Sequence, residues 1–297
     1  MEINKIGLLG AGTMGQGIAW ALAAAGKEVV LYDIKQEFCD RAVSAIGKSL
    51  TKSEEKGKSP AGTKQAILNK IKPTGKFEDM ADVDFIVECV FEDMDVKRDV
   101  YTRLDAMLRP EVIIATNTSS LSITEIAAFT KRADKVVGMH FFNPANVMKL
   151  VEVIPCLQTS EATIEVVVEL SKAIGKKPVK VKEGPGFVVN RILVPAINEG
   201  AQILYENLAT AEDIDTAMKL GAGWPMGPLE LCDLVGADIS LAVMNTLYAE
   251  TGDSKYRPST LLKQQVRAGW LGRKTSKGFS NINNYLTNTI GGKNDVI

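Results

Sequence analysis

The chain contains a single histidine, His140, within the segment HFFNPANVMKLVEV. Histidine suits proton transfer near neutral pH because the unperturbed pKa of its imidazole is about 6.5. Glu152 follows twelve residues later, and its carboxylate is suited to orient an imidazole and to stabilise the protonated ring. Proton chemistry through an imidazole therefore requires His140. The alternative is that His140 is a satisfied structural histidine and that Glu152 is a surface carboxylate on an alternating strand.

A glycine-rich turn near the N-terminus is suited to bind phosphate. The sequence GAGTMG follows an apolar run over 5–9 and opens an alanine-rich stretch, which is the context of a dinucleotide-binding turn. Gly10 is expected to make the tight turn, Gly12 to let the backbone approach the pyrophosphate, and Gly15 to let helix and strand pack closely. The helix N-terminus would add amide donors and partial positive charge. A glycine turn without a ligand is the alternative.

Asp33 ends the next apolar run, about twenty residues after the turn. A carboxylate there accepts hydrogen bonds from the adenosine ribose and repels a 2′-phosphate, so the pattern favours NAD. Lys35 nearby leaves NADP open. Thr13 and Met14, inside the turn, are expected to contact the cofactor as well. FAD uses the same fingerprint, but the chain is short for a second nucleotide-binding half beside a substrate domain.

Alternating strands and helices must position these residues. Short apolar runs predict strands over 5–9, 28–32, 85–88, 113–116, 136–139, 150–154 and 179–181. Helical spacing predicts helices over 14–25, 35–56, 94–107 and 161–174. This alternation predicts an α/β fold, a Rossmann-type doubly wound sheet with helices on both faces.

Beyond the sequence GPG at 184–186 the strand-like runs vanish. Helical patterns cover 188–207, 211–219, 229–250 and 260–268. We therefore predict a Rossmann domain over 1–185 and a smaller all-α domain over 186–297. The apolar surface of these helices suggests a subunit contact. The polar tail from residue 281 is expected to be loosely held.

The composition is that of a globular protein with two domains. Of 297 residues, 45% are hydrophobic and 24% charged, and 35 basic with 36 acidic residues leave a net charge of -1. No overall field attracts nucleic acid or an anionic membrane, so we expect neither as a partner. The N-terminus lacks a signal-peptide pattern. Four scattered cysteines without a CxxC pair indicate reduced thiols in the cytoplasm and no metal site.

Four separated blocks, TNTSSLSI, HFFNPANVMKLVEV, GPGFVVNR and GWPMGPLELCDLVGAD, resemble the short-chain 3-hydroxyacyl-CoA dehydrogenases. The bacterial 3-hydroxybutyryl-CoA dehydrogenases are the subgroup that the chain most resembles, and the likeness runs from about residue 3 to residue 279. The resemblance implies an NAD-binding domain followed by a helical, dimer-forming domain. It implies interconversion of an (S)-3-hydroxyacyl-CoA thioester, with 3-hydroxybutyryl-CoA as the expected substrate, and its 3-ketoacyl-CoA.

The resemblance also implies roles for four residues. His140 would be the catalytic base, Glu152 its partner, and Ser119 and Asn190 would position the substrate oxygens, with Ser119 reaching the cofactor as well. Their chemistry agrees, because removing a hydroxyl proton while hydride leaves the carbon needs a base on the oxygen, and neutral donors stabilise a developing oxyanion. As alternatives, Asn190 buttresses the interdomain turn, and Ser119 caps the following helix as its serine neighbours at 120 and 122 equally would.

Further contacts carry over from the family with less specific motifs. The resemblance assigns cofactor contacts to Glu92, Lys97, Asn143 and Lys274. Ser49 and Lys56, in the stretch KSLTKSEEK, match positions that bind CoA, where a lysine serves as a mobile point charge for phosphate. The alternative for this stretch is a solvated helix face.

The chain departs from the family in one respect, and rival functions remain. Phe279 is followed by SNINNY rather than an aromatic-rich ending, and no hydratase domain precedes the first strand, so a stand-alone dehydrogenase is expected. Dehydrogenases of free hydroxy or sugar acids commonly use a lysine on the interdomain helix, but this helix opens GFVVNRILVP. Gulonate dehydrogenase and lambda-crystallin relatives share the HFFNP-like block. A non-catalytic NAD-binding relative would not need all four site residues.

Overall fold

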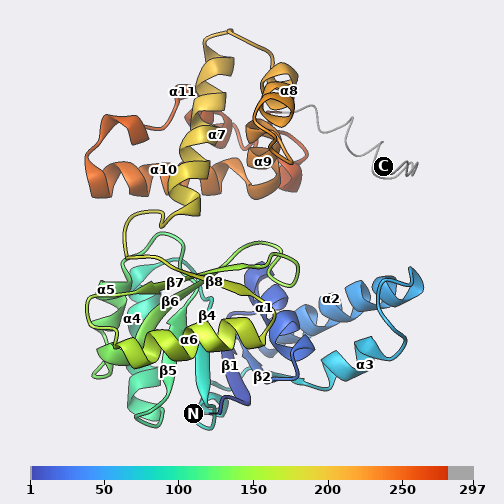
Figure 1. The fold of residues 1–297 in the computed structure, drawn as a ribbon, viewed down its shortest axis with the longest axis vertical. Helices are drawn as coiled ribbons and strands as arrows, with labels where there is room; N and C mark the ends of the chain where they lie inside the picture. Colours follow the sequence, from blue (N-terminus) through green and yellow to red (C-terminus); the bar gives the residue numbers. More distant parts are fainter. Residues whose placement is uncertain (1, 280–297) are drawn as a thin grey trace. The chain divides into compact units, whose positions relative to one another are not determined.

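The computed structural model describes residues 2–279. The chain divides into two compact units, Met1–Phe187 and Val188–Ile297, which are described separately. The first unit contains an eight-stranded sheet (Figure 1). Its strands are β1 (Lys5–Leu9), β2 (Glu28–Tyr32), β3 (Ile71–Thr74), β4 (Phe85–Glu88), β5 (Ile113–Thr116), β6 (Val136–Phe141), β7 (Leu150–Pro155) and β8 (Lys177–Lys180).

The strand order is β3-β2-β1-β4-β5-β6-β7-β8. The first six strands are parallel, β7 is antiparallel to β6, and β8 is parallel to β7. The order of the six parallel strands is that of the Rossmann fold, and the order reverses between β1 and β4. This confirms the predicted fold class and puts the glycine turn after β1 at the switch point, where such sheets bind ligands.

Helices cover both faces of this sheet. They are α1 (Thr13–Ala24), α2 (Gln36–Glu55), α3 (Thr63–Leu68), α4 (Met94–Met107), α5 (Ile123–Ala127) and α6 (Glu161–Ala173). Buried side chains of α1, α2 and α6 pack on one face, where α6 crosses the strands (Figure 1). Buried side chains of α4 and α5 pack on the other.

Alternation along the strands decides which side chains face α4 and α5. In β6, Val137, Met139 and Phe141 belong to the core under α1, α2 and α6. Successive side chains of a strand point to opposite faces, so His140 faces the α4 side. The same alternation puts Glu152 of β7 on that side, because its neighbours in the strand belong to the α1 core.

Sequence periodicity missed part of this unit. It predicted no element between residues 60 and 85, where the structure has α3 and β3. Pro73 lies inside β3, which pairs only with β2, as expected for proline on an edge strand. The strand predicted over 179–181 lies instead at Lys177–Lys180, and β6 extends two residues further than predicted, so that it includes His140.

The second unit is helical, with helices α7 (Val189–Tyr205), α8 (Ala211–Gly221), α9 (Pro228–Val235), α10 (Ala237–Thr251) and α11 (Thr260–Arg267). The single helix predicted over 229–250 was wrong. The chain bends by 102° between α9 and α10 at Gly236, whose φ of +116° favours glycine. The core includes Ile197, Leu229, Cys232 and Leu262. The polar tail lies outside the described residues.

Over residues 2–279, no single helix is long and apolar enough to cross a membrane. Taken together as a bent pair, α9 and α10 have sufficient length and apolar composition.

Asp84, just before β4, ties the start of β1 to the sheet. Its Oδ2 accepts the amides of Asn4 (3.0 Å) and Lys5 (2.9 Å), and its Oδ1 accepts from Arg109 (3.2 Å). Burial alone would raise the pKa of Asp84, but these donors together lower it. A carboxyl whose pKa is lower in the folded state stabilises the fold above its unfolded pKa, and this is lost as pH falls through the folded value.

We therefore expect Asp84→Asn to lower the free energy of unfolding by about 1 kcal/mol at pH 7, with a melting temperature lower by about 2–4 °C. The difference from the parent should shrink below about pH 3.9. Scanning calorimetry at several pH values checks this. Asp82→Asn is the control, since Asp82 is exposed and its ion pair with Lys5 lies at the surface, where such pairs contribute little. A difference that stays constant with pH would contradict the assignment.

Candidate active site

The turn between β1 and α1 is packed tightly except at one position. Gly10 has a φ of +98°, and a Cβ there would lie 2.4 Å from the carbonyl oxygen of Cys89. A Cβ on Gly15 would lie 1.8 Å from the oxygen of Gly10. At Gly12 a Cβ would meet nothing within 4 Å. Of these three glycines, only Gly12 therefore leaves its backbone open to a ligand.

The start of α1 fits a pyrophosphate. Gly12 is the N-cap of this helix and supplies no side-chain cap, and the first turn has no acidic side chain. The amides of the first turn and the helix dipole are thus available to an anion. Thr13 is exposed and Met14 is half-buried against the core, so only Thr13 presents its side chain to solvent at this turn.

Asp33 is held at the end of β2 beside the turn. Its Oδ2 accepts the amide of Ala11 (2.8 Å) and its Oδ1 accepts the amide of Ile34 (2.8 Å). A carboxylate has about four acceptor sites, so capacity remains for ribose hydroxyls. The turn, the helix start and Asp33 together fit a dinucleotide at this edge of the sheet.

His140 and Glu152 lie directly opposite each other in the antiparallel pair β6–β7. The imidazole Nδ1 is 2.8 Å from Glu152 Oε2. The two residues are 5% and 1% exposed. An ionised carboxylate only accepts hydrogen bonds, so pairing with an ionised Glu152 would put the proton of the neutral ring on Nδ1 and leave Nε2 as an acceptor. The structure thus joins the two residues that the sequence singled out.

Two phenylalanines that sequence reasoning missed flank the imidazole. The ring centroids of Phe142 and Phe187 lie 4.6 and 5.4 Å from that of His140. Phe187 has a φ of +50°, a conformation that is costly for a bulky residue and clusters at functional sites. The double phenylalanine after His140 was the available sequence signal for Phe142. Both rings restrict the imidazole to its pairing with Glu152.

Residues 117–120 form the Ser119 segment, which packs around the carboxylate of Glu92. Glu92 Oε1 accepts the amides of Ser119 (3.0 Å) and Ser120 (3.3 Å) and the hydroxyl of Thr118. The N-cap of α5 is Ser122, whose hydroxyl accepts the amide of Glu125. Ser119 is therefore not the helix cap, which was its structural alternative.

The Ser119 segment is also tied to the strand that carries His140. Asn117 Oδ1 accepts the amide of Phe141 at 2.8 Å. Asn117 follows β5, and Phe141 follows His140 directly in β6. This contact sets the end of β5 beside the end of β6, on the same edge of the sheet as the glycine turn.

Lys97 is buried between two carboxylates. It is 1% exposed, and its Nζ lies 2.8 and 3.0 Å from the two oxygens of Glu88 and 3.5 Å from Glu92. Sequence reasoning missed Glu88, whose signal was a carboxylate ending the apolar run FIVE. In the structure, Lys97 reaches the Ser119 segment through Glu92.

Asn143 is exposed, in a loop that begins with a cis peptide to Pro144. The Lys176 Nζ donates to the carbonyls of Ala145 (2.6 Å) and Met148 (2.8 Å), and burial lowers the pKa of this lysine. Lys176 therefore holds the loop that presents Asn143.

The remaining predicted residues are scattered. Ser49 and Lys56 are exposed, on α2 and at its C-cap. In the second unit, Asn190 is half-buried in the first turn of α7. Lys274 pairs with both oxygens of Asp238 at 2.6 Å.

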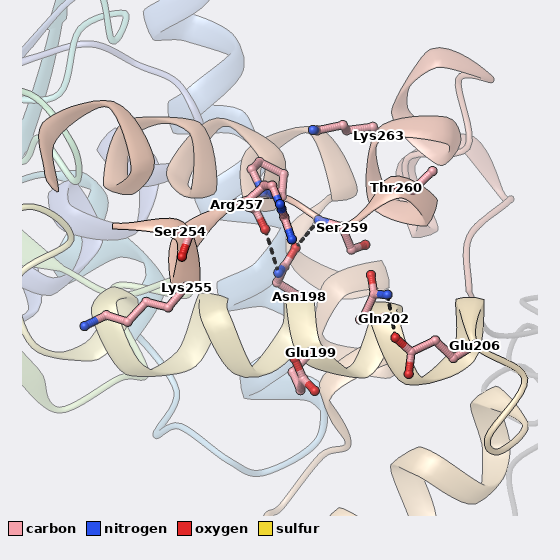
Figure 2. A pocket seen from close by; sticks show the side chains of 11 residues that line it. Asn198, Glu199, Gln202, Glu206, Ser254, Lys255, Arg257, Ser259, Thr260 and Lys263 are labelled. Carbon is pink, nitrogen blue, oxygen red and sulfur yellow. Dashed lines mark hydrogen bonds between the residues drawn. The ribbon is translucent and has the colours of Figure 1, made fainter. Parts of the chain in front are cut away.

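A pocket of about 620 Å³ lies within the second unit, between α7 and residues 254–263 (Figure 2). Asn198 donates to the Arg257 carbonyl (3.2 Å) and accepts the Ser259 amide (2.7 Å) at its wall. The pocket contains none of the predicted site residues. Over residues 2–279, no group of three or more His, Cys, Asp or Glu side chains could hold a metal ion.

Comparison with known proteins decides the family. The 3-hydroxyacyl-CoA dehydrogenase NAD-binding domain matches residues 5–184, and the C-terminal domain of the same family matches residues 186–282. The chain belongs to the 3-hydroxyacyl-CoA dehydrogenase family. This confirms the resemblance carried by the four sequence blocks, and NAD is the cofactor of this dehydrogenase.

Relatives match the dehydrogenase over nearly its whole length. A 3-hydroxybutyryl-CoA dehydrogenase of Clostridioides difficile is 52% identical over 279 residues, covering 94% of this chain and 99% of its own. One of Bradyrhizobium diazoefficiens is 44% identical, covering 93% and 94%. The crystal structure of (S)-3-hydroxybutyryl-CoA dehydrogenase from Ralstonia eutropha superposes with a TM-score of 0.89 at 47% identity, covering 94% and 98%.

Asp33→Ala is expected to weaken NADH binding about 10–100-fold, because a hydrogen-bonded carboxylate contact contributes roughly 1.5–3 kcal/mol. The turnover number at saturating NADH should change little, since Asp33 is expected to bind the adenosine ribose. Fluorescence titration with NADH and steady-state kinetics measure the two quantities. Asp40→Ala, which removes an exposed carboxylate of α2, is the control. An unchanged dissociation constant in the Asp33 variant would remove Asp33 from the cofactor site.

Proposed function

We propose that this 3-hydroxyacyl-CoA dehydrogenase interconverts (S)-3-hydroxybutyryl-CoA and acetoacetyl-CoA, with His140 as general acid–base and Glu152 as its charge partner. The observation that carries the proposal is the buried 2.8 Å contact between Nδ1 of His140 and Glu152. The short acyl chain is supported by relatives that are named 3-hydroxybutyryl-CoA dehydrogenases. Glu152 and His140 supply proton chemistry, and the bound NAD supplies the hydride acceptor.

The proposed proton path runs through Nε2. In the oxidation direction this nitrogen takes the proton of the 3-hydroxyl group, and the ring becomes an imidazolium. Glu152 stabilises the new charge at Nδ1, which matters because little water reaches a ring that is 5% exposed. In reduction the imidazolium returns the proton to the ketone oxygen. Ser119 and Asn190 orient that oxygen by hydrogen bonds and stabilise its developing charge.

The other predicted contacts form part of the same proposal. Glu92, Lys97, Asn143 and Lys274 would contact NAD at its nicotinamide ribose. Ser49 and Lys56 would bind the CoA arm, for which their exposure on one helix suits a large, charged group. In this scheme residues 1–185 bind NAD, and residues 186–297 contribute to substrate binding.

We also propose that the helical unit forms a homodimer. Apolar side chains that a stable monomer tends to bury are exposed on this unit. They are Ile192, Leu208, Leu220, Leu234, Ile239 and Trp270. A second copy of the chain would cover them.

The substrate class is tested by NADH oxidation with acetoacetyl-CoA beside free acetoacetate. We expect the ratio kcat/KM to be at least about a hundredfold higher for the thioester, because binding energy from the CoA arm contributes to the transition state. A longer 3-ketoacyl-CoA tests chain length, and a lower kcat/KM is expected for it. Comparable turnover of free acetoacetate would overturn the thioester assignment.

His140→Ala is expected to lower kcat about 10²–10⁴-fold, the usual contribution of a general acid–base, while NADH binding stays within about threefold of the parent. Stopped-flow turnover and NADH fluorescence measure both. Glu152→Gln keeps an acceptor at Nδ1 but removes the charge, so a smaller loss of kcat is expected. Near-normal turnover in the His140 variant would exclude it as the base.

A further inference from the structure

A buried cluster of charged side chains lies next to the Ser119 segment. Its central residue, Glu88, has no role in the proposed mechanism. Glu88 is 0% exposed and ends β4. Its Oε1 accepts from Lys97 Nζ (2.8 Å) and from the amide of Val90 (2.8 Å). Its Oε2 accepts the hydroxyls of Thr116 (2.8 Å) and Tyr101 (3.4 Å). Every one of these donors points at a single carboxylate.

The charges of this cluster are fixed by one another. Burial alone would lower the pKa of Lys97, but the carboxylates of Glu88 and Glu92 raise it above its usual value. Burial and Glu88 raise the pKa of the Tyr101 hydroxyl well above its usual value. At neutral pH an ammonium thus lies between two carboxylates beside a neutral phenol.

Stability alone is a weak reason for such a cluster. Removing two charges from water costs several kcal/mol per ion, and well-packed apolar residues of similar volume often serve as well. Titratable groups with strongly perturbed pKa values cluster at functional sites. The residues that the cluster holds in place can therefore indicate why the chain buries these charges.

Two chains of contacts lead from Glu88 to the Ser119 segment. In the first, Lys97 Nζ lies 3.5 Å from Glu92 Oε2, and the other oxygen of Glu92 accepts the amides of Ser119 and Ser120. In the second, the Thr116 hydroxyl donates to Glu88 and accepts the amide of Thr118 at 3.2 Å. Three consecutive amides, those of Thr118, Ser119 and Ser120, are therefore held through two separate routes.

The sheet places this cluster beside the histidine. Glu88 is paired with Thr116, and Thr116 with Gly138, in adjacent parallel strands. His140 is two residues beyond Gly138 in β6, so the three strands end at the same edge with these side chains on the same face. The expected adenosine end of the site is held by hydrogen bonds of its own, which the amides of Ala11 and Ile34 donate to Asp33.

We propose that Glu88 is a positioning residue for the nicotinamide end of the site, because it fixes Glu92 and the Ser119 segment through Lys97 and Thr116. Glu88 touches neither substrate nor cofactor. The proposal rests on the proposed roles of Glu92 and Ser119. It separates the two halves of the dinucleotide site: binding of the adenosine diphosphate ribose half does not depend on Glu88, and binding of the nicotinamide half does.

Glu88→Gln, which keeps the shape and removes the charge, tests this separation. We expect the dissociation constant of NADH and the kcat for acetoacetyl-CoA to worsen by about 10–100-fold, the usual effect of a lost supporting contact. The dissociation constant of ADP-ribose, which lacks the nicotinamide, should stay within about twofold. Calorimetric titration with both ligands gives the ratio. A merely structural role would weaken both ligands alike.

Thr116→Val repeats the test with the ion pair intact, and it serves if the Glu88 variant does not fold. It breaks the second chain of contacts only, so the same selective loss is expected at smaller size. Asp105→Asn is the matched control on α4, because Asp105 pairs with Arg132 at 2.8 Å and both are largely buried. That variant should lower the melting temperature and leave the ratio of NADH to ADP-ribose affinity unchanged.

Equal weakening of NADH and ADP-ribose in both site variants, or no weakening of either, would overturn the role of Glu88. Failure of the proposed function would give a different result, because the parent protein would then bind NADH without turning over acetoacetyl-CoA. The ratio of the two affinities would still report on Glu88.

Discussion

The antiparallel pairing of β6 with β7 is the constraint on which the site depends. It places His140 opposite Glu152 on one face of the sheet, with Nδ1 and Oε2 2.8 Å apart. A slip of one residue in this register would turn Glu152 to the other face. Because both residues are buried in apolar strands, the hydrophobic pattern that fixes the register also fixes the proposed proton-transfer pair. The rings of Phe142 and Phe187 then leave the imidazole one orientation.

The parallel strands supply the rest of the site at the same edge. The order reverses between β1 and β4, so the glycine turn after β1 lies next to the end of β4. Beyond it come the ends of β5 and β6, which carry the Ser119 segment and His140. Glu88 of β4 accepts the hydroxyl of Thr116 in β5, and Asn117 after β5 accepts the amide of Phe141 in β6. The two buried pairs here join different elements: His140 of β6 with Glu152 of β7, and Glu88 of β4 with Lys97 of α4.

Much of this was readable from sequence, because apolar runs and glycine spacing depend on local geometry. The glycine turn, six of the eight strands and the Rossmann class were predicted. The edge strand β3 was not, since Pro73 and its polar neighbours break the pattern. The apolar residues over 229–250 recur with helical spacing on both sides of Gly236. One long helix and two shorter ones would show the same spacing, so the bend at Gly236 could not be predicted. The antiparallel direction of β7 and the burial of Lys97 were out of reach, because periodicity reports neither strand direction nor which charges meet.

We propose that Nδ1 of His140 donates to Glu152 while Nε2 carries the reaction. Because the chain has one histidine, ¹⁵N labelling of histidine in an untagged protein gives the signals of this imidazole alone. We expect a neutral ring protonated on Nδ1, with Nε2 as the only nitrogen that gains a proton as pH falls. A neutral ring protonated on Nε2, or a proton lost and gained at Nδ1, would contradict it.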